Sequence, residues 1–242
     1  SYLYKLANGQ KVVIVPKEGE TFVKTYVNTG SMNEPDDKRG ISHFIEHNLF
    51  NGSGGSDTNA WLKPGEFFQT VDKMGAETNA STSFAQTDYY VATNQLKKND
   101  LATAIKIHAE MLEHPLFTFQ MLEKEKGPVT SEISMILDDP ENIATNNTLK
   151  NLYGIKSTST DIIGGTVNNI KSLKRKDVVD YYRQNYFPGD MVTVVTGDVK
   201  PEDVMKLISN NFHSRKQPNA NRKFETLTPI QKTVRNDLIS DK

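Results

Sequence analysis

The stretch Gly-Ile-Ser-His-Phe-Ile-Glu-His-Asn-Leu-Phe, residues 40–50, carries the strongest structural signal in the sequence. Its apolar side chains stand at Ile41, Phe44, Ile45 and Leu49, three to four residues apart along most of the segment. This spacing is typical of a helix that buries one face in a protein core. We therefore expect a buried helix here, with its polar chemistry gathered on the remaining face.

That remaining face carries His43, Glu46 and His47 in the pattern H-x-x-E-H. Residues four apart on a helix lie one turn apart, so the two imidazoles can reach a single ion. Glu46 lies on the rim of the same face, where it can touch water at the ion without being a ligand. Such residues can also be ordinary polar-face side chains, but their order, in a chain with only five His, favours a metal site.

A catalytic zinc site needs a third protein ligand and keeps one position open. Glu125 and Glu132 are seven residues apart, which places them two turns apart on one face of a second expected helix. Either could supply the carboxylate, and the other could orient a histidine from behind. The spacing alone does not choose among Glu123, Glu125 and Glu132.

The composition limits the classes of function that are possible. The chain of 242 residues contains no Cys, which excludes disulfides, thiolate zinc sites and cysteine nucleophiles. A net charge of −1 gives no reason to expect nucleic acid or an anionic membrane surface as a partner. No apolar run approaches the length of a membrane span, and no secretory signal is visible, although the chain does not begin with Met. These features favour a cytoplasmic protein.

The order of the expected elements predicts an α+β fold with a mostly antiparallel sheet packed by helices. Asn8-Gly9 marks a hairpin, Pro128 is expected to kink or restart its helix, and residues 51–57 and 154–169 are expected to be loops. The expected strands are Tyr2–Leu6, Lys11–Pro16, Thr21–Asn28, Glu77–Ser83, Asp88–Thr93 and Met191–Thr196, and the expected helices are Gly65–Met74, Asn99–Glu113, Phe119–Leu137, Glu141–Leu152, Arg175–Asn185 and Glu202–Asn211.

Three segments carry a resemblance to a known family: residues 40–50, residues 75–82 (GAETNAST) and residues 125–133 (EKGPVTSEI). H-x-x-E-H is the reverse of the thermolysin-type motif and is the signature of inverted zincins. The sequence resembles the M16 metallopeptidases, the family that contains pitrilysin, insulin-degrading enzyme and the mitochondrial processing peptidase. The resemblance runs from the first hairpin to about residue 198, and it implies the α+β domain of that family, also described as LuxS/MPP-like.

The resemblance also implies roles for individual residues. It assigns one zinc ion to His43, His47 and Glu132, with Glu125 as the supporting acid seven positions before the last ligand, six residues lying between the two. Glu46 would be the general base of a zinc endopeptidase that hydrolyses extended peptides with a metal-activated water. A further implication is that peptides bind as an added strand, with Asn79 and Ala80 as substrate contacts.

The same resemblance divides the chain into parts. Residues 1–212 are expected to be the zinc-binding peptidase domain and residues 213–224 a polar linker. Residues 225–242 would be a tail or the beginning of a second M16-like domain. Family members close two such domains on a peptide, so the expected partners are a peptide substrate and a second M16-like domain or subunit. Without that partner the chain is expected to be a poor peptidase.

Two other functions remain open from the sequence. The first is a non-catalytic M16-like subunit with an assembly or regulatory role, but such members typically have a broken metal motif, whereas all four positions are intact here. The second is a zinc hydrolase that acts on something other than peptides, because a fold does not determine its substrate.

Overall fold

A computed structural model describes residues 1–54, 60–93, 99–153 and 162–213. The expected linker, apart from His213, and the expected tail at 225–242 lie outside the described residues, so this division of the chain stays a prediction. Within the described ranges, no helix combines the length and the apolar character needed to cross a membrane.

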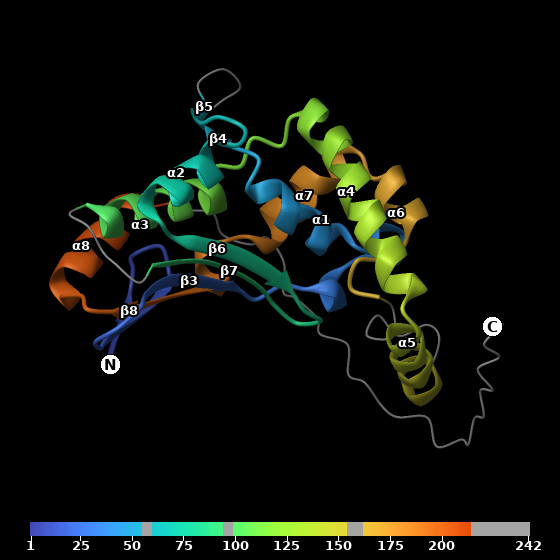
Figure 1. Cartoon of the computed structure of the whole chain (residues 1–242), viewed down its shortest axis with the longest axis horizontal. Helices are drawn as coiled ribbons and strands as arrows, with labels where there is room; N and C mark the ends of the chain where they lie inside the picture. Colours follow the sequence, from blue (N-terminus) through green and yellow to red (C-terminus); the bar gives the residue numbers. More distant parts are fainter. Residues whose placement is uncertain (55–59, 94–98, 154–161, 214–242) are drawn as a thin grey trace.

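A six-stranded sheet forms the base of the domain (Figure 1). Its strands 2 and 8 are parallel, and every other neighbouring pair is antiparallel, which confirms the mostly antiparallel sheet. In spatial order the strands are β1 (Tyr2–Lys5), β2 (Lys11–Pro16), β8 (Met191–Gly197), β3 (Thr21–Val27), β7 (Thr87–Thr93) and β6 (Glu77–Thr82).

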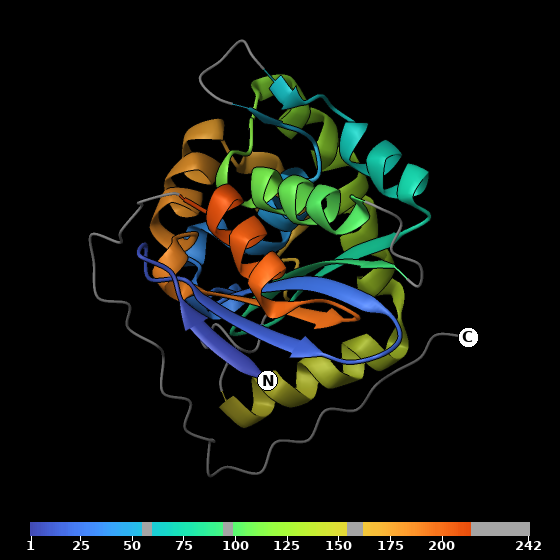
Figure 2. The same ribbon diagram turned by 90° about the vertical axis from the view of Figure 1, so that its left-hand side faces the viewer.

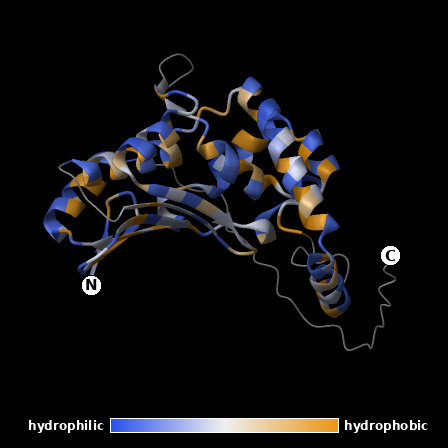
Figure 3. Ribbon diagram, viewed as in Figure 1, coloured by the Kyte–Doolittle hydropathy of each residue, from blue (hydrophilic) through white to orange (hydrophobic). Residues whose placement is uncertain are grey.

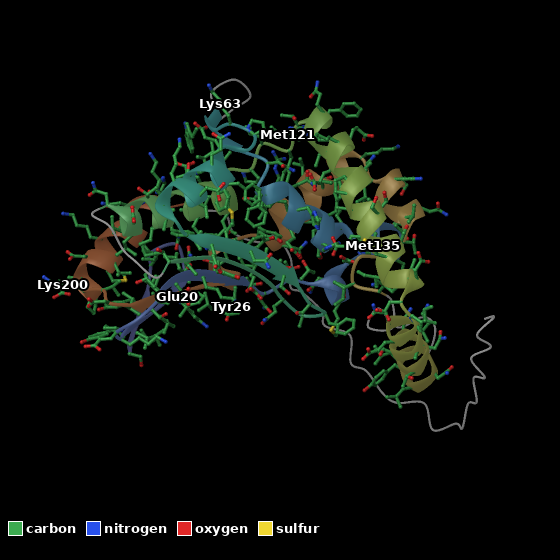
Figure 4. All side chains as sticks on the ribbon, in the orientation of Figure 1. Glu20, Tyr26, Lys63, Met121, Met135 and Lys200 are labelled. Carbon is green, nitrogen blue, oxygen red and sulfur yellow. The ribbon has the colours of Figure 1, made fainter. Side chains whose placement is uncertain are left out.

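One face of the sheet is covered by helices, as Figures 1 and 2 show. Strand β3 explains the division, because Val23, Thr25 and Val27 are buried while the residues between them are only half-buried. Tyr26 extends on the side away from the helices (Figure 4). The helices are α1 (Ile41–Leu49), α2 (Glu66–Met74), α3 (Asp100–Glu113), α4 (Phe119–Asp138), α5 (Pro140–Tyr153), α6 (Val167–Ser172), α7 (Arg175–Asn185) and α8 (Pro201–Asn211).

Helix α1 lies in the middle of the helical layer, and its apolar stripe is buried as the sequence predicts. Phe44, Ile45 and Leu49 have no exposed surface, and Ile41 is 1% exposed. Hydrophobic and hydrophilic residues alternate around the other helices and along the strands as well (Figure 3). None of the residues of helix α5 is buried, and this helix lies apart from the sheet in Figure 1.

The beginning of α1 is held by a buried carboxylate. Glu34 accepts hydrogen bonds from the backbone N–H groups of Gly40 and Ser42, each at 2.8 Å. Burial raises the pKa of Glu34 to about 7, although the two N–H donors oppose that shift. Gly40 has φ of 89°, and a Cβ there would lie 2.1 Å from the carbonyl oxygen of Gly164. Only glycine allows the chain to enter the helix at this point.

Several details differ from the sequence-based expectations. Helix α4 runs unbroken through Pro128. Proline has no N–H to bond the backbone carbonyl of Lys124, but both residues are exposed, so water can bind that carbonyl instead. Gly127 also helps, because a residue without Cβ relieves the clash before a proline. The short helix α6 (Val167–Ser172) begins at Val167, within the segment 154–169 that was expected to be a loop, since Thr166 accepts a capping bond from Asn169 N. Ser53–Gly54 (β4), inside the segment 51–57 that was expected to be a loop, pair antiparallel with Ala60–Leu62 (β5), so that part of the expectation is wrong.

Replacing Glu34 tests how strongly the entry to α1 is held. Glu34→Ala leaves two buried N–H groups without their acceptor, which should lower the free energy of unfolding by about 1–3 kcal/mol. Urea denaturation at about pH 8, where the carboxyl is ionised, measures the change. Glu18→Ala removes an exposed acid and should shift stability by less than about 0.5 kcal/mol. Equal effects of the two changes would contradict the proposed role of Glu34.

Candidate metal centre

Three side chains from two helices meet beside the edge of the sheet. His43 and His47 project from α1, and Glu132 projects from α4. The Nε2 atoms of the two histidines are 3.2 Å apart, and they lie 3.5 Å and 3.3 Å from the two carboxylate oxygens of Glu132. Among the described residues, His43, His47 and Glu132 form a group that could hold a metal ion, because one ligand atom from each lies within 4.8 Å of the other two.

The spacing of these atoms fits a zinc ion. Ligands about 2.0–2.1 Å from a tetrahedral zinc are themselves about 3.3 Å apart. The Nε2–Nε2 separation of 3.2 Å is close to that value, and so are the distances of 3.5 and 3.3 Å from the two nitrogens to different oxygens of the Glu132 carboxylate. Two imidazole nitrogens and one carboxylate oxygen are also a donor set that zinc takes in hydrolytic enzymes, with a fourth position left open.

The two acids that the sequence could not separate from Glu132 have other partners. Glu125 Oε1 lies 3.1 Å from His47 Nδ1, so Glu125 contacts the far side of the imidazole. Glu123 is paired with Lys126 at 2.6 Å. Burial opposes ionisation of Glu125, but hydrogen bonds from His47 and Asn51 outweigh it and hold its pKa below the ordinary value. Geometry therefore distinguishes a carboxylate among the donors from one that supports a histidine.

In the metal-free protein, the pKa values of His43 and His47 are shifted in opposite directions. Burial, followed by the neighbouring imidazole, lowers the pKa of His43. Burial acts in the same sense on His47, but its hydrogen bond to Glu125 and the nearby carboxylates hold its pKa above the ordinary value. A proton therefore competes with a cation more strongly at His47 than at His43.

Glu46 lies beside the donor atoms and is held separately from them. It is 8% exposed, and burial raises its pKa to about 7. Thr82 of strand β6 donates a hydrogen bond to Oε2 of Glu46. No other described residue forms a hydrogen bond with this carboxylate, so Oε1 stays available for an exchangeable proton.

A cavity of about 390 Å³ opens directly on these residues. Ala80 lines it, whereas Asn79 does not; instead, Asn79 Oδ1 accepts a hydrogen bond of 2.9 Å from Ala80 N. The cavity is lined by His43, Glu46 and Glu132, by strand β6 and Phe84, by Ile136, Asn142, Thr145, Asn146 and Leu149 of α4 and α5, and by residues 162–164.

Sequence reasoning missed two residues that touch the candidate site. Thr82 bonds to Glu46, and Asn51 Nδ2 donates to Glu125 Oε2 at 3.0 Å. Thr82 stands at the end of the strand that carries Ala80, so its side of the strand could have been inferred from the period-2 alternation. No comparable signal marks Asn51, because its partner lies 74 positions away.

The fold and the converging donors define an α+β domain with a candidate metal centre, and comparison with known proteins specifies its family. The model of the family "Insulinase (Peptidase family M16)" matches residues 12–166, and that of the "Peptidase M16 inactive domain" matches residues 172–239. The chain belongs to the M16 peptidase family. The α+β M16 fold expected from the sequence is thereby confirmed.

Individual relatives agree with this membership. The chain is 31% identical over 227 residues to the uncharacterized zinc protease YmfH of Bacillus subtilis, covering 87% of this chain and 48% of that protein. It is 26% identical to the mitochondrial-processing peptidase subunit beta of Dictyostelium discoideum, covering 86% and 42% respectively. The crystal structure of the periplasmic protease PqqL from Escherichia coli shares the fold, with a TM-score of 0.83, 23% identity and coverage of 93% and 25%.

These relatives support a peptidase function and suggest zinc as the metal. The chain spans about half the length of the first relative and about a quarter of PqqL.

The pKa shifts of the two histidines predict how the affinity for zinc depends on pH. Since a protonated imidazole cannot bind zinc and the pKa of His47 is raised, protons should compete at a higher pH than for an ordinary histidine. Zinc affinity of the chain should fall as the pH is lowered from about 7.5 to about 6, approaching roughly tenfold per pH unit once the pH is below the pKa of His47. Competition with a chromophoric chelator at constant ionic strength measures this dependence. An affinity that stays constant over this range would exclude the two histidines as ligands.

Proposed function

We propose that this chain is the zinc-binding domain of an endopeptidase that hydrolyses peptide bonds of extended peptides. The observation that carries the proposal is the arrangement of three metal-type donors and one separate carboxylate around the same cavity. A metal site with only a structural purpose would use four protein ligands and leave no cavity beside them.

In this proposal His43, His47 and Glu132 hold the zinc ion, and Glu125 supports His47 from the far side. Zinc bound there would polarise a scissile carbonyl and make water more acidic.

Glu46 is proposed as the general base. Its pKa of about 7 lies near the value at which a group both accepts and returns a proton efficiently at neutral pH. Thr82 occupies Oε2, which leaves Oε1 to take a proton from the attacking water. The same oxygen then delivers that proton to the leaving amine.

Strand β6 is proposed as the peptide-binding edge. It is the last strand of the sheet, and its other side pairs with β7. Because Ser83 N donates to Gln86 O, the alternation of an antiparallel ladder directs the N–H and C=O groups of Ala80 toward the free edge. An extended peptide can add there as a further strand. Asn79 Oδ1 now accepts from Ala80 N, so a peptide carbonyl would replace an existing bond.

Replacing the proposed base separates chemistry from metal binding. Glu46→Gln keeps the shape of the side chain and its contact with Thr82 but cannot accept the proton, so peptide cleavage should fall by about 10²–10⁴-fold. Zinc content, measured by atomic absorption, should stay near one ion per chain. The assay uses a quenched fluorescent peptide and the parent protein, by which we mean this chain together with the proposed second M16-like domain. Unchanged cleavage by the Gln variant would remove Glu46 from the mechanism.

The length of the relatives predicts a second outcome. Since this chain spans about half of one relative and about a quarter of another, the isolated chain should bind zinc yet cleave peptides at least about 10²-fold more slowly than the parent protein. Measuring kcat/KM for both proteins with one peptide tests this expectation. Equal efficiency would show that the chain needs no partner half.

The two other functions give different results in the same measurements. A non-catalytic subunit would cleave no peptide even in the parent protein. A zinc hydrolase of another class would bind zinc and lose its activity in the Glu46→Gln variant, but with a substrate other than peptides.

A further inference from the structure

Asn51 stands just beyond the end of α1 and contacts the acid that supports the metal centre. Its Nδ2 donates to Oε2 of Glu125 at 3.0 Å, and Oε1 of the same carboxylate lies 3.1 Å from Nδ1 of His47. The backbone of Asn51 is fixed as well, because its N–H donates to Asn48 O at 3.2 Å. The two oxygens of Glu125 thus have one partner each, and both partners come from the α1 segment.

We propose that Asn51 is a positioning residue of the metal centre, which acts on His47 through Glu125. The inference rests on the proposed zinc site but not on peptidase activity. A carboxylate with one anchor can rotate about its last carbon–carbon bond, whereas two anchors fix its plane. With the plane fixed, Oε1 of Glu125 faces Nδ1 of His47, which keeps the proton on Nδ1 and directs the free Nε2 lone pair toward the metal.

The exposure of these groups makes such an anchor necessary. The Glu125 side chain is 18% exposed and that of His47 is 24% exposed, so water can compete for both. An amide attached to the same segment as His47 competes better than water, because its orientation is already fixed by the chain. The partner histidine offers no substitute, since Nδ1 of His43 is buried and forms no hydrogen bond with any described residue.

The competing explanation is that Asn51 merely joins α1 to α4. Such a contact would change the stability of the metal-free fold but not the affinity for zinc at constant stability. A role through Glu125 has two signatures that a structural contact lacks. It changes zinc affinity directly, and its effect disappears when Glu125 can no longer orient His47.

The test uses the 242-residue chain and zinc itself as the probe. Asn51→Ala should weaken zinc binding by roughly tenfold, at the lower end of the effect of residues that support metal ligands. The dissociation constant is measured by chelator competition at about pH 7.5, and the urea midpoint of the metal-free chain is measured beside it, so that the stability lost with the hydrogen bond is separated from the loss of zinc affinity. The absorption bands of the Co²⁺-loaded chain should shift, because the orientation of His47 in the ligand field changes.

A matched control and a double variant complete the design. Asn211→Ala removes one hydrogen bond of 2.8 Å from a half-buried Asn at the end of α8, so it should leave zinc affinity unchanged. Glu125→Gln should weaken zinc binding, and adding Asn51→Ala to it should have little further effect, because both act through one carboxylate.

Three results would overturn the inference. The first is wild-type zinc affinity in Asn51→Ala, and the second is full additivity of the two substitutions in the double variant. The third is a chain that binds no zinc, which would also remove the proposed metal site. A different result would refute the proposed function alone. In that case Asn51→Ala weakens zinc binding as expected, but the parent protein cleaves no peptide.

Discussion

The burial of one stripe of α1 is the constraint on which the rest of the site depends. Each of the four apolar side chains in this stripe contributes about 1.5–3 kcal/mol on full burial, so the helix cannot rotate about its axis without a large loss of stability. Because that rotation is fixed, the direction of His43, Glu46 and His47 is fixed too. Glu34 also limits sliding of the helix along its axis, since its carboxylate accepts hydrogen bonds from the backbone N–H groups of Gly40 and Ser42 at the start of α1.

Helix α4 brings the second half of the site into place by the same principle. Leu122, Val129 and Ile133 are buried, which orients the helix so that its two important acids face α1. Glu125 and Glu132 share a face but stand about 10.5 Å apart along the axis, given a rise of 1.5 Å per residue. One ion cannot bind both. The spacing therefore places Glu132 among the donor atoms and Glu125 behind His47, where it contacts the other ring nitrogen.

Local patterns predicted the features that local physics determines. The Asn8-Gly9 hairpin, the stripe of α1 and the alternation along β3 all follow from periodicity within a few residues. The choice of Glu132 over Glu123 and Glu125 required the resemblance, because it depends on how two helices pack. Glu34, Asn51 and Thr82 escaped prediction for a related reason, since each acts on a partner between 6 and 74 positions away through one side-chain contact. Pro128 was misjudged because its exposure on α4 could not be read from its neighbours.

The bond between Thr82 and Glu46 joins the two parts that the proposed reaction must align. Thr82 belongs to β6, the strand to which a peptide would add, and Glu46 is the proposed base on α1, the helix that carries His43 and His47. A peptide paired with β6 and a Glu46 carboxylate hydrogen-bonded to β6 would keep the same relative position, because motion of the sheet edge displaces both together. Misplacement by about 1 Å can cost an enzyme 10²-fold in rate, and direct attachment limits that error. In the proposed reaction, the Thr82 side chain would thus couple peptide binding at β6 to proton transfer by Glu46.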